Sequence, residues 1–291
     1  MKVLRKALFV IALVICGAML VLIGQLSSKP SLEQASSMQR VRETGVLRCG
    51  YFVEPPFIEM DVKTGKLTGI IPDLMEQIAQ YAGIKVAFTN EVLVSTMIDD
   101  LNLGKCDMIC ASAGYNPIRS KQALFVEPFG YAPLYSVVRS DETRIASDLS
   151  NLETSGVVVG ALDGEVGTLT AQARFPKAKY VFLPQMSDMG AVLQDVVSKK
   201  ADITFVSPQV FVNYDTNNPG KLKVLSREYP LATFPGGFMV KAGDRELADF
   251  ISHSQAFLNS VGVLDRILDK YDPGRQLILR PAKLYRIENE R

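Results

Sequence analysis

The chain has 291 residues, of which 47% are hydrophobic and 22% charged, and its formal net charge is +1. This length is enough for one large or two medium domains with a sizeable core. A nearly neutral chain carries no basic field, so its composition argues against nucleic acid as a partner.

The first 24 residues are typical of an export signal. A short basic segment, 1–6, precedes an unbroken apolar run over 7–24. Cleaved signals have apolar cores of about 7–15 residues, whereas about 18 or more can span a bilayer. A cleaved signal peptide, an uncleaved membrane anchor and a lipoprotein modified at Cys16 all stay open. Each places the rest of the chain in the periplasm or another extracytoplasmic space, because the basic end stays inside.

Residues 25–40 are polar and without periodicity, and we predict a linker there. Beyond it strand and helix patterns alternate, which favours an α/β fold with mostly parallel sheets. A helix over 73–82 is expected to begin at Asp73 and to bury Leu74, Ile78 and Tyr81 on one face. The other elements expected in this part are strands at 46–49, 84–88 and 108–111 and a helix at 94–103.

An extended segment from Tyr131 is predicted to cross into a second lobe, and the Pro-Gly-Gly run at 235–237 is predicted to return. The first lobe is therefore expected to be discontinuous, over 41–131 and 236–273, and the second continuous over 132–235. The charged tail, 274–291, gives no pattern. Between and after the crossings we expect strands at 157–161 and 203–206, a polar turn at 215–220, and helices at 246–259 and 263–271.

Three cysteines lie outside the leader: Cys49, Cys106 and Cys110. The spacing of the last two is not that of zinc ligands, and the single histidine, His253, is far away, so we predict no metal. Cys49 and Cys110 fall on strands expected to be neighbours. Buried free thiols are the favoured state, and one disulfide stays open in an oxidising compartment.

The stretch from Gly104 to Arg119 carries the clearest chemical pattern. A short apolar strand opens into the small residues of 112–114, where a ligand can lie against backbone N–H groups. Asn116 and Pro117 are typical of a helix start, and Arg119 follows in the first turn. A guanidinium with nearby amides can hold one carboxylate by paired hydrogen bonds. The simpler interpretation is a turn followed by a surface arginine.

These segments resemble the family-3 amino-acid-binding proteins of bacterial ABC transporters, in which a D-x-I strand leads to a small-residue loop and then T-x-x-R. The resemblance extends, in the family's order, over residues 40–273. It implies a two-lobed, type 2 periplasmic-binding fold that closes on a ligand between its lobes, with no cofactor and an ABC permease as partner. The other matching segments are Pro-Pro-Phe at 55–57, Gly-Ile-Ile-Pro-Asp-Leu at 69–74, Ala-Asp-Ile at 201–203 and Gly-Gly-Phe at 236–238.

The resemblance implies that Arg119 grips the α-carboxylate of the ligand, with help from Ser112 and the amide of Gly114. Phe57 and either Tyr51 or Phe52 are candidates for an apolar wall, although a core role stays open for each.

Glu54 stands where the family often places an aromatic residue. It would offer a negative charge to a ligand cation, or it is simply an exposed loop glutamate.

The second lobe departs from the family's pattern. Its helix start reads Gly164-Glu165-Val166, so the usual hydroxyls are missing and only backbone amides remain. Ser207 stands where the family carries an aspartate for the ligand's ammonium. An unpaired charge in a dry cleft costs on the order of several kcal/mol. Either Glu54 or another acid therefore compensates, or the ligand lacks an α-ammonium.

We therefore expect a solute-binding protein, not an enzyme, that delivers an amino acid or small organic carboxylate to an ABC importer. A membrane-tethered sensor or interaction module of the same fold is the alternative, with membrane contact only through an uncleaved N-terminal segment. A periplasmic dehydratase-like enzyme is less favoured. In that case Glu165 would be a buried general acid, but no second catalytic group is visible.

Overall fold

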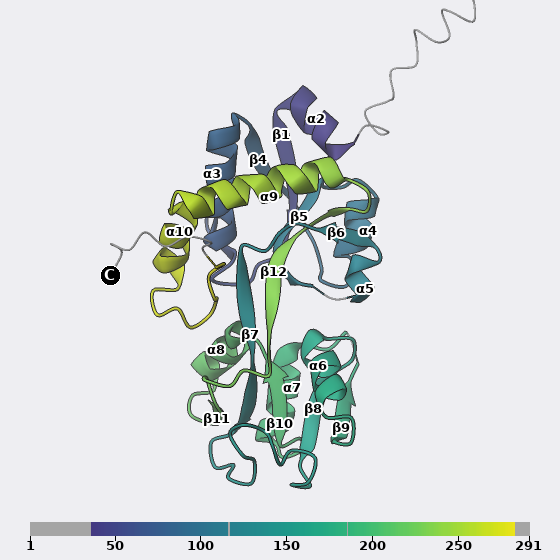
Figure 1. The fold of residues 1–291 in the computed structure, drawn as a ribbon, viewed down its shortest axis with the longest axis vertical. Coiled ribbons are helices and arrows are strands. Elements are labelled where there is room, and N and C mark those ends of the chain that lie inside the picture. Colours follow the sequence, from purple (N-terminus) through teal and green to yellow (C-terminus); the bar gives the residue numbers. More distant parts are fainter. Residues whose placement is uncertain (1–35, 116, 185, 283–291) are drawn as a thin grey trace, which may run out of the picture.

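The computed structural model describes residues 36–115, 117–184 and 186–282, and Figure 1 shows two lobes joined by two long strands. The signal or anchor predicted over 1–24, and the helix cap predicted at Asn116, lie outside these residues. Within the described part of the chain, no helix is long and apolar enough to cross a membrane.

The first lobe, in the upper half of Figure 1, combines a sheet with helices on both faces. Its strands are β1 (Val46–Tyr51), β2 (Glu59–Met60), β3 (Leu67–Thr68), β4 (Lys85–Glu91), β5 (Met108–Gly114) and β6 (Ala123–Phe125). Its helices are α2 (Ser37–Thr44), α3 (Ile70–Ala82), α4 (Met97–Asn102), α5 (Pro117–Ser120), α9 (Arg245–Ser260) and α10 (Val263–Tyr271).

The second lobe, in the lower half of Figure 1, repeats the α/β pattern on a smaller scale. Its strands are β8 (Val158–Leu162), β9 (Lys179–Leu183), β10 (Ile203–Val206) and β11 (Leu222–Val224). Its helices are α6 (Val166–Arg174), α7 (Met189–Val197) and α8 (Pro208–Asn217).

Strands β7 (Gly130–Arg139) and β12 (Ala232–Lys241) join the lobes and pair with each other in antiparallel fashion. The strand order is β4-β1-β5-β12-β7-β10-β8-β9. Strand β7 pairs with β12 over 130–134 and with β10 over 135–138, so its two halves belong to different lobes. In the first lobe β1 runs parallel to β4 and β5, and in the second β8 runs parallel to β9 and β10.

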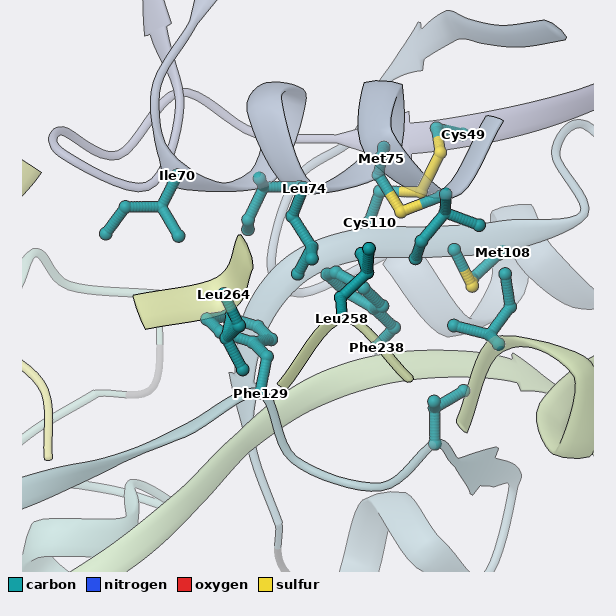
Figure 2. Packing of buried hydrophobic residues seen from close by; sticks show 14 of the residues in the cluster. Cys49, Ile70, Leu74, Met75, Met108, Cys110, Phe129, Phe238, Leu258 and Leu264 are labelled. Atoms are coloured by element: carbon teal, nitrogen blue, oxygen red, sulfur yellow. A yellow bond between two sulfur atoms is a disulfide. The ribbon is translucent and has the colours of Figure 1, made fainter. Parts of the chain in front are cut away.

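Strand β5 is buried on both faces, as expected for a central strand whose side chains alternate. Met108 and Cys110 point into the cluster that packs under α3, α9 and α10, while Ile109 and Ala111 join the cluster under α4. Figure 2 shows the first of these clusters, which is built around fully buried residues such as Leu74, Phe129 and Phe238.

Several predicted boundaries need correction. Helix α2 takes up residues 37–40 of the predicted linker, with Ser36 accepting a hydrogen bond as its cap. Helix α3 begins at Ile70 after Gly69, before the predicted start at Asp73. Tyr81 does not lie on its buried face: the side chain is 59% exposed and packs edge-on against the ring of Phe257.

Two other segments are more regular than predicted. Residues 112–114 continue strand β5, because Gly236 and Gly237 of β12 pair with them. Helix α8 begins at Pro208 with Ser207 as its cap and continues to Asn217, so it covers the first half of the turn predicted over 215–220. The strands expected at 157–161 and 203–206 and the two C-terminal helices lie within about one residue of their predicted bounds.

Residues 272–282, which follow α10, pack against the rest of the protein, although no pattern in this part of the sequence predicted it. Leu279 and Tyr131 exchange two backbone hydrogen bonds of 2.8 and 2.9 Å, which fixes this segment to the first residues of β7. Ile278 fills the space over Gly130, where a Cβ atom would lie 2.3 Å from its side chain. Gln276 accepts a hydrogen bond from Arg227 of the second lobe at 3.2 Å. We call residues 272–282 the C-terminal strap.

Cys49 and Cys110 form a disulfide between β1 and β5, so the expectation of free thiols is wrong for this pair. Their Cα atoms lie 5.4 Å apart on neighbouring strands, within the range that a disulfide spans. Cys106 is a buried free thiol, and burial raises its pKa to about 11.

Replacing both Cys49 and Cys110 with alanine should lower the free energy of unfolding by about 2–4 kcal/mol, because the bridge restricts the unfolded chain over a separation of 61 residues. Urea unfolding with and without a reductant measures this. The reductant should destabilise the wild type and the Cys106→Ala control but leave the double variant unaffected. A wild type that ignores the reductant would contradict the prediction.

Candidate functional site

A cavity of about 270 Å³ lies between the lobes, beside the strands that join them. It brings together most of the residues that the sequence singled out, although they come from five separate segments. Those that line it are Glu54, Phe57, Ser112, Gly114, Arg119, Val166 and Ser207. Phe52, the alternative to Tyr51, also lines it.

Two predicted residues are placed elsewhere. Tyr51 ends strand β1 and packs edge-on against the ring of Phe88, with 5.7 Å between ring centroids. It therefore supports the core of the first lobe, and Phe52 faces the cavity in its place. Gly164 has φ +74° in the turn before α6, a conformation that favours glycine, so its role is to shape that turn.

The first lobe presents Arg119 to the cavity. The residue lies on the short helix α5, and its side chain is 18% exposed. Its Nη1 donates to the carbonyl of Gly114 at 3.3 Å, so the end of β5 holds the guanidinium in place. Ser112, on the same strand, packs over Gly236, where a Cβ would lie 2.8 Å from the Ser112 Oγ. A larger residue at 236 would therefore displace the Ser112 hydroxyl.

The second lobe presents the start of helix α6. Val166 and Gly167 line the cavity from the first turn of this helix, whose amides and positive dipole end favour an anion. A Cβ on Gly167 would lie 2.3 Å from the carbonyl oxygen of Phe205, so glycine lets the helix pack directly on β10. The buried Thr168 Oγ1 accepts a hydrogen bond from the amide of Leu162 at 3.0 Å.

An ion pair joins the two lobes across the cavity. Arg119 Nη2 lies 3.9 Å from Glu165 Oε1, and the glutamate side chain is 34% exposed. A Cβ on Gly114 would lie 3.8 Å from the side chain of Val166, so the lobes are also in van der Waals reach. An ion pair this long and this accessible contributes about 0–1 kcal/mol. A ligand carboxylate can therefore replace Glu165 at the guanidinium without great cost.

Glu54 is half-buried at the edge of the cavity, so its interpretation as an exposed loop residue is wrong. Its backbone closes the tight turn through Pro55 and Pro56 by accepting from Phe57 N at 2.8 Å and donating to Ile58 O at 2.9 Å. Burial, and then the negative charge of Glu165, raise the pKa of the Glu54 carboxyl to about 7.

Helix α8 contributes Ser207 and Gln209 from its first turn. The Ser207 hydroxyl caps the helix by accepting from Val210 N at 3.5 Å, and it brings no charge to the cavity. Gln209 is 6% exposed and its Nε2 donates to Asn213 Oδ1 at 2.8 Å. Among the residues that the structure describes, nothing donates to its Oε1.

The sequence analysis missed Gln209, and it did not pair Glu165 with Arg119. The Ser-Pro start of α8 was a local signal for Gln209, because it places the next residues in the first turn of a helix directly after the end of strand β10. Phe234 on β12 and Met189 on α7 also line the cavity. No group of three potential metal ligands occurs in the described ranges. The arrangement suits a small zwitterion held between one guanidinium, two carboxylates and aromatic walls.

A model of the bacterial extracellular solute-binding proteins, family 3, matches residues 47–273. Among curated proteins, the membrane-bound lytic murein transglycosylase F of Salmonella typhimurium is 24% identical over 242 residues, which cover 79% of this chain and 44% of that protein. The corresponding protein of Salmonella typhi is also 24% identical and is covered to 48%. The chain thus spans less than half the length of these curated relatives.

Solved structures of amino-acid-binding proteins share the fold. An ancestral amino-acid-binding protein, described as a precursor of cyclohexadienyl dehydratase, has a TM-score of 0.64 and 25% identity and covers 81% of this chain and 99% of its own. An ancestral arginine-binding protein bound to glutamine has a TM-score of 0.61 and 26% identity, with coverages of 78% and 97%. The arginine-binding protein of T. maritima, at 22% identity and a TM-score of 0.63, supports the fold alone.

The Glu54→Gln variant should lose less stability than the wild type between pH 5 and pH 8. Since the pKa of Glu54 is about 7 in the folded protein and near 4.5 when unfolded, the folded state holds the extra proton between these values. The stabilisation from this proton is fully present below about pH 4.5 and is lost as the pH rises through about 7. The free energy of unfolding of the wild type should fall by about 1–3 kcal/mol over this range.

Thermal unfolding of the ligand-free protein across this pH range measures the difference. Glu59→Gln, an exposed glutamate on β2, is the matched control and should follow the wild type. If Glu54→Gln follows the wild type as well, the carboxyl is not perturbed.

Proposed function

Because the chain belongs to the bacterial extracellular solute-binding proteins of family 3, we propose that it closes two lobes on an amino acid or small organic carboxylate outside the cytoplasm and delivers it to an ABC importer. The proposed lobes are 41–131 with 236–273, and 132–235. A binding protein of this kind needs no chemistry, because a transporter can distinguish the closed, ligand-bound form from the open one.

The observation that carries this proposal is the position of Arg119. Its guanidinium lies in the interlobe cavity, is held by the end of β5, and faces the first turn of α6 from the other lobe. A carboxylate between the two would receive hydrogen bonds from both lobes at once. Such a ligand would stabilise the closed arrangement over the open one.

In a panel of amino acids, amines and small carboxylates, at least one carboxylate should raise the melting temperature of the purified protein. Saturation at one hundred times the dissociation constant adds about 2.7 kcal/mol, which is about 5–10 °C for a protein of this size. Arg119→Ala should abolish that rise. Lys121→Ala, an exposed residue just after α5, should not.

A panel without any response, or a response that survives Arg119→Ala, would contradict carboxylate binding at this site. Amines that stabilise while carboxylates do not would move the proposal to a ligand without an acid group.

A membrane-tethered sensor of the same fold is the second candidate, and it is supported by the similarity to a membrane-bound transglycosylase over less than half of that protein's length. Retention of the intact N-terminus in washed membranes would favour it. A dehydratase-like activity is a third candidate, supported by Glu165 in the cavity and by the similarity to a precursor of such an enzyme. Turnover of a cyclohexadienyl substrate that is lost in Glu165→Gln would favour it.

A further inference from the structure

When Arg119, Glu54 and Glu165 are all ionised, the interlobe cavity carries an excess of one negative charge, and a cation beside Glu54 would favour this ionised state. Of the residues that line it, three are charged: Arg119, Glu54 and Glu165. The rest are aromatic or aliphatic residues, glycines, two serines and Gln209. A cavity with one guanidinium and two carboxylates is neutralised by a ligand with a net charge of +1.

This excess charge is unfavourable without a cation to balance it. Arg119 is the one cation among the lining residues, and it is already paired with Glu165. Glu54 is half-buried beside that pair, and burying a carboxylate without a compensating cation is costly. A cationic group on the ligand would relieve this cost, whereas a neutral group would add to it.

Gln209 gives a second and independent indication. Its side chain is 94% buried, as the 6% exposure shows, and it lines the cavity. Its Nε2 is used by Asn213, and its Oε1 accepts nothing from the described residues. Buried amide oxygens are nearly always paired, so this acceptor matches a donor on the ligand. An unpaired acceptor in a cavity that also holds two carboxylates favours N–H groups on the ligand over a second acid.

We propose that the cavity selects a ligand with one carboxylate and two cationic groups, the class to which the basic α-amino acids belong. This inference rests on the proposed function, because the carboxylate is the group that Arg119 would hold. The two glutamates then supply the negative charge that the neutral Ser207 does not bring to the position where the family carries an aspartate.

The position of each charge assigns the groups. Glu165 lies 3.9 Å from Arg119, so it is placed for the α-ammonium, which is one carbon away from the carboxylate. Glu54 then meets the second cation. A guanidinium at the end of the ligand side chain has enough N–H donors to bond the carboxylate of Glu54 and the Oε1 of Gln209 together.

The test is calorimetric titration of the purified full chain with four probes: L-arginine, its neutral isostere L-citrulline, L-glutamate, and agmatine, which lacks the carboxylate. We expect arginine to bind about 10- to 100-fold more tightly than citrulline, as for other partly buried charge pairs. Glutamate should not bind measurably, and agmatine should bind at least about tenfold more weakly than arginine.

Glu54→Gln removes the charge and keeps the shape of the side chain. It should reduce the ratio of arginine to citrulline affinity toward one, mainly by weakening arginine. Glu59→Gln makes the same change in net charge on the exposed strand β2 and should leave the ratio unaltered. Melting temperatures of both variants report whether they fold. If Glu54→Gln does not fold, the ratio of arginine to citrulline affinity in the wild type still tests the inference.

Equal affinities for arginine and citrulline in the wild type would overturn the inference, as would a ratio that Glu54→Gln leaves unchanged. Either result would still leave an amino acid bound, so the proposed function would stand. If arginine does not bind, the inference fails, and the wider panel of carboxylates decides the proposed function. If agmatine binds as well as arginine, the carboxylate site at Arg119 fails, and the proposed function fails with it.

Discussion

The antiparallel pairing of β7 with β12 is the constraint on which the rest of the molecule depends. Strand β7 enters the second lobe beside the strand by which the chain leaves it, so over residues 36–282 two adjacent backbone connections join the separately packed cores. These connections lie side by side, and the cavity lies next to them. The proposed function requires a hinge motion at these two strands, which would separate the residues on the two walls without unpacking either core.

The ion pair between Arg119 and Glu165 gives the ligand-free cavity an internal substitute for a bound carboxylate. The pair is long and accessible, which limits how strongly it holds the lobes together. Glu54 has the opposite character: it is half-buried and has no cation of its own among the residues that line the cavity. Glu165 is thus paired with the arginine, while Glu54 lines the cavity without a cation among the other lining residues, which is the basis of the proposed cationic ligand.

Local sequence patterns predicted the alternation of strands and helices and the two crossings, because each depends on residues close together in the chain, whereas the ligand role of Arg119 was predicted from the resemblance to the family. These patterns placed Cys49 and Cys110 on neighbouring strands but could not decide between free thiols and a disulfide, since that depends on the distance between the two residues in the folded sheet. The sequence also could not predict that Arg119 pairs with Glu165 or that Gln209 Oε1 lacks a donor among the described residues. Both depend on how the second lobe is oriented against the first.

The C-terminal strap has a mechanical consequence. It is bonded to the start of β7 through Leu279, reaches the cavity wall with Leu277, and contacts the second lobe through Gln276. The strap thus lies against one of the strands that join the lobes and also contacts the second lobe. If the lobes close on a ligand as proposed, the geometry of the contact between Arg227 and Gln276 would change, so a probe attached to the strap would report ligand occupancy.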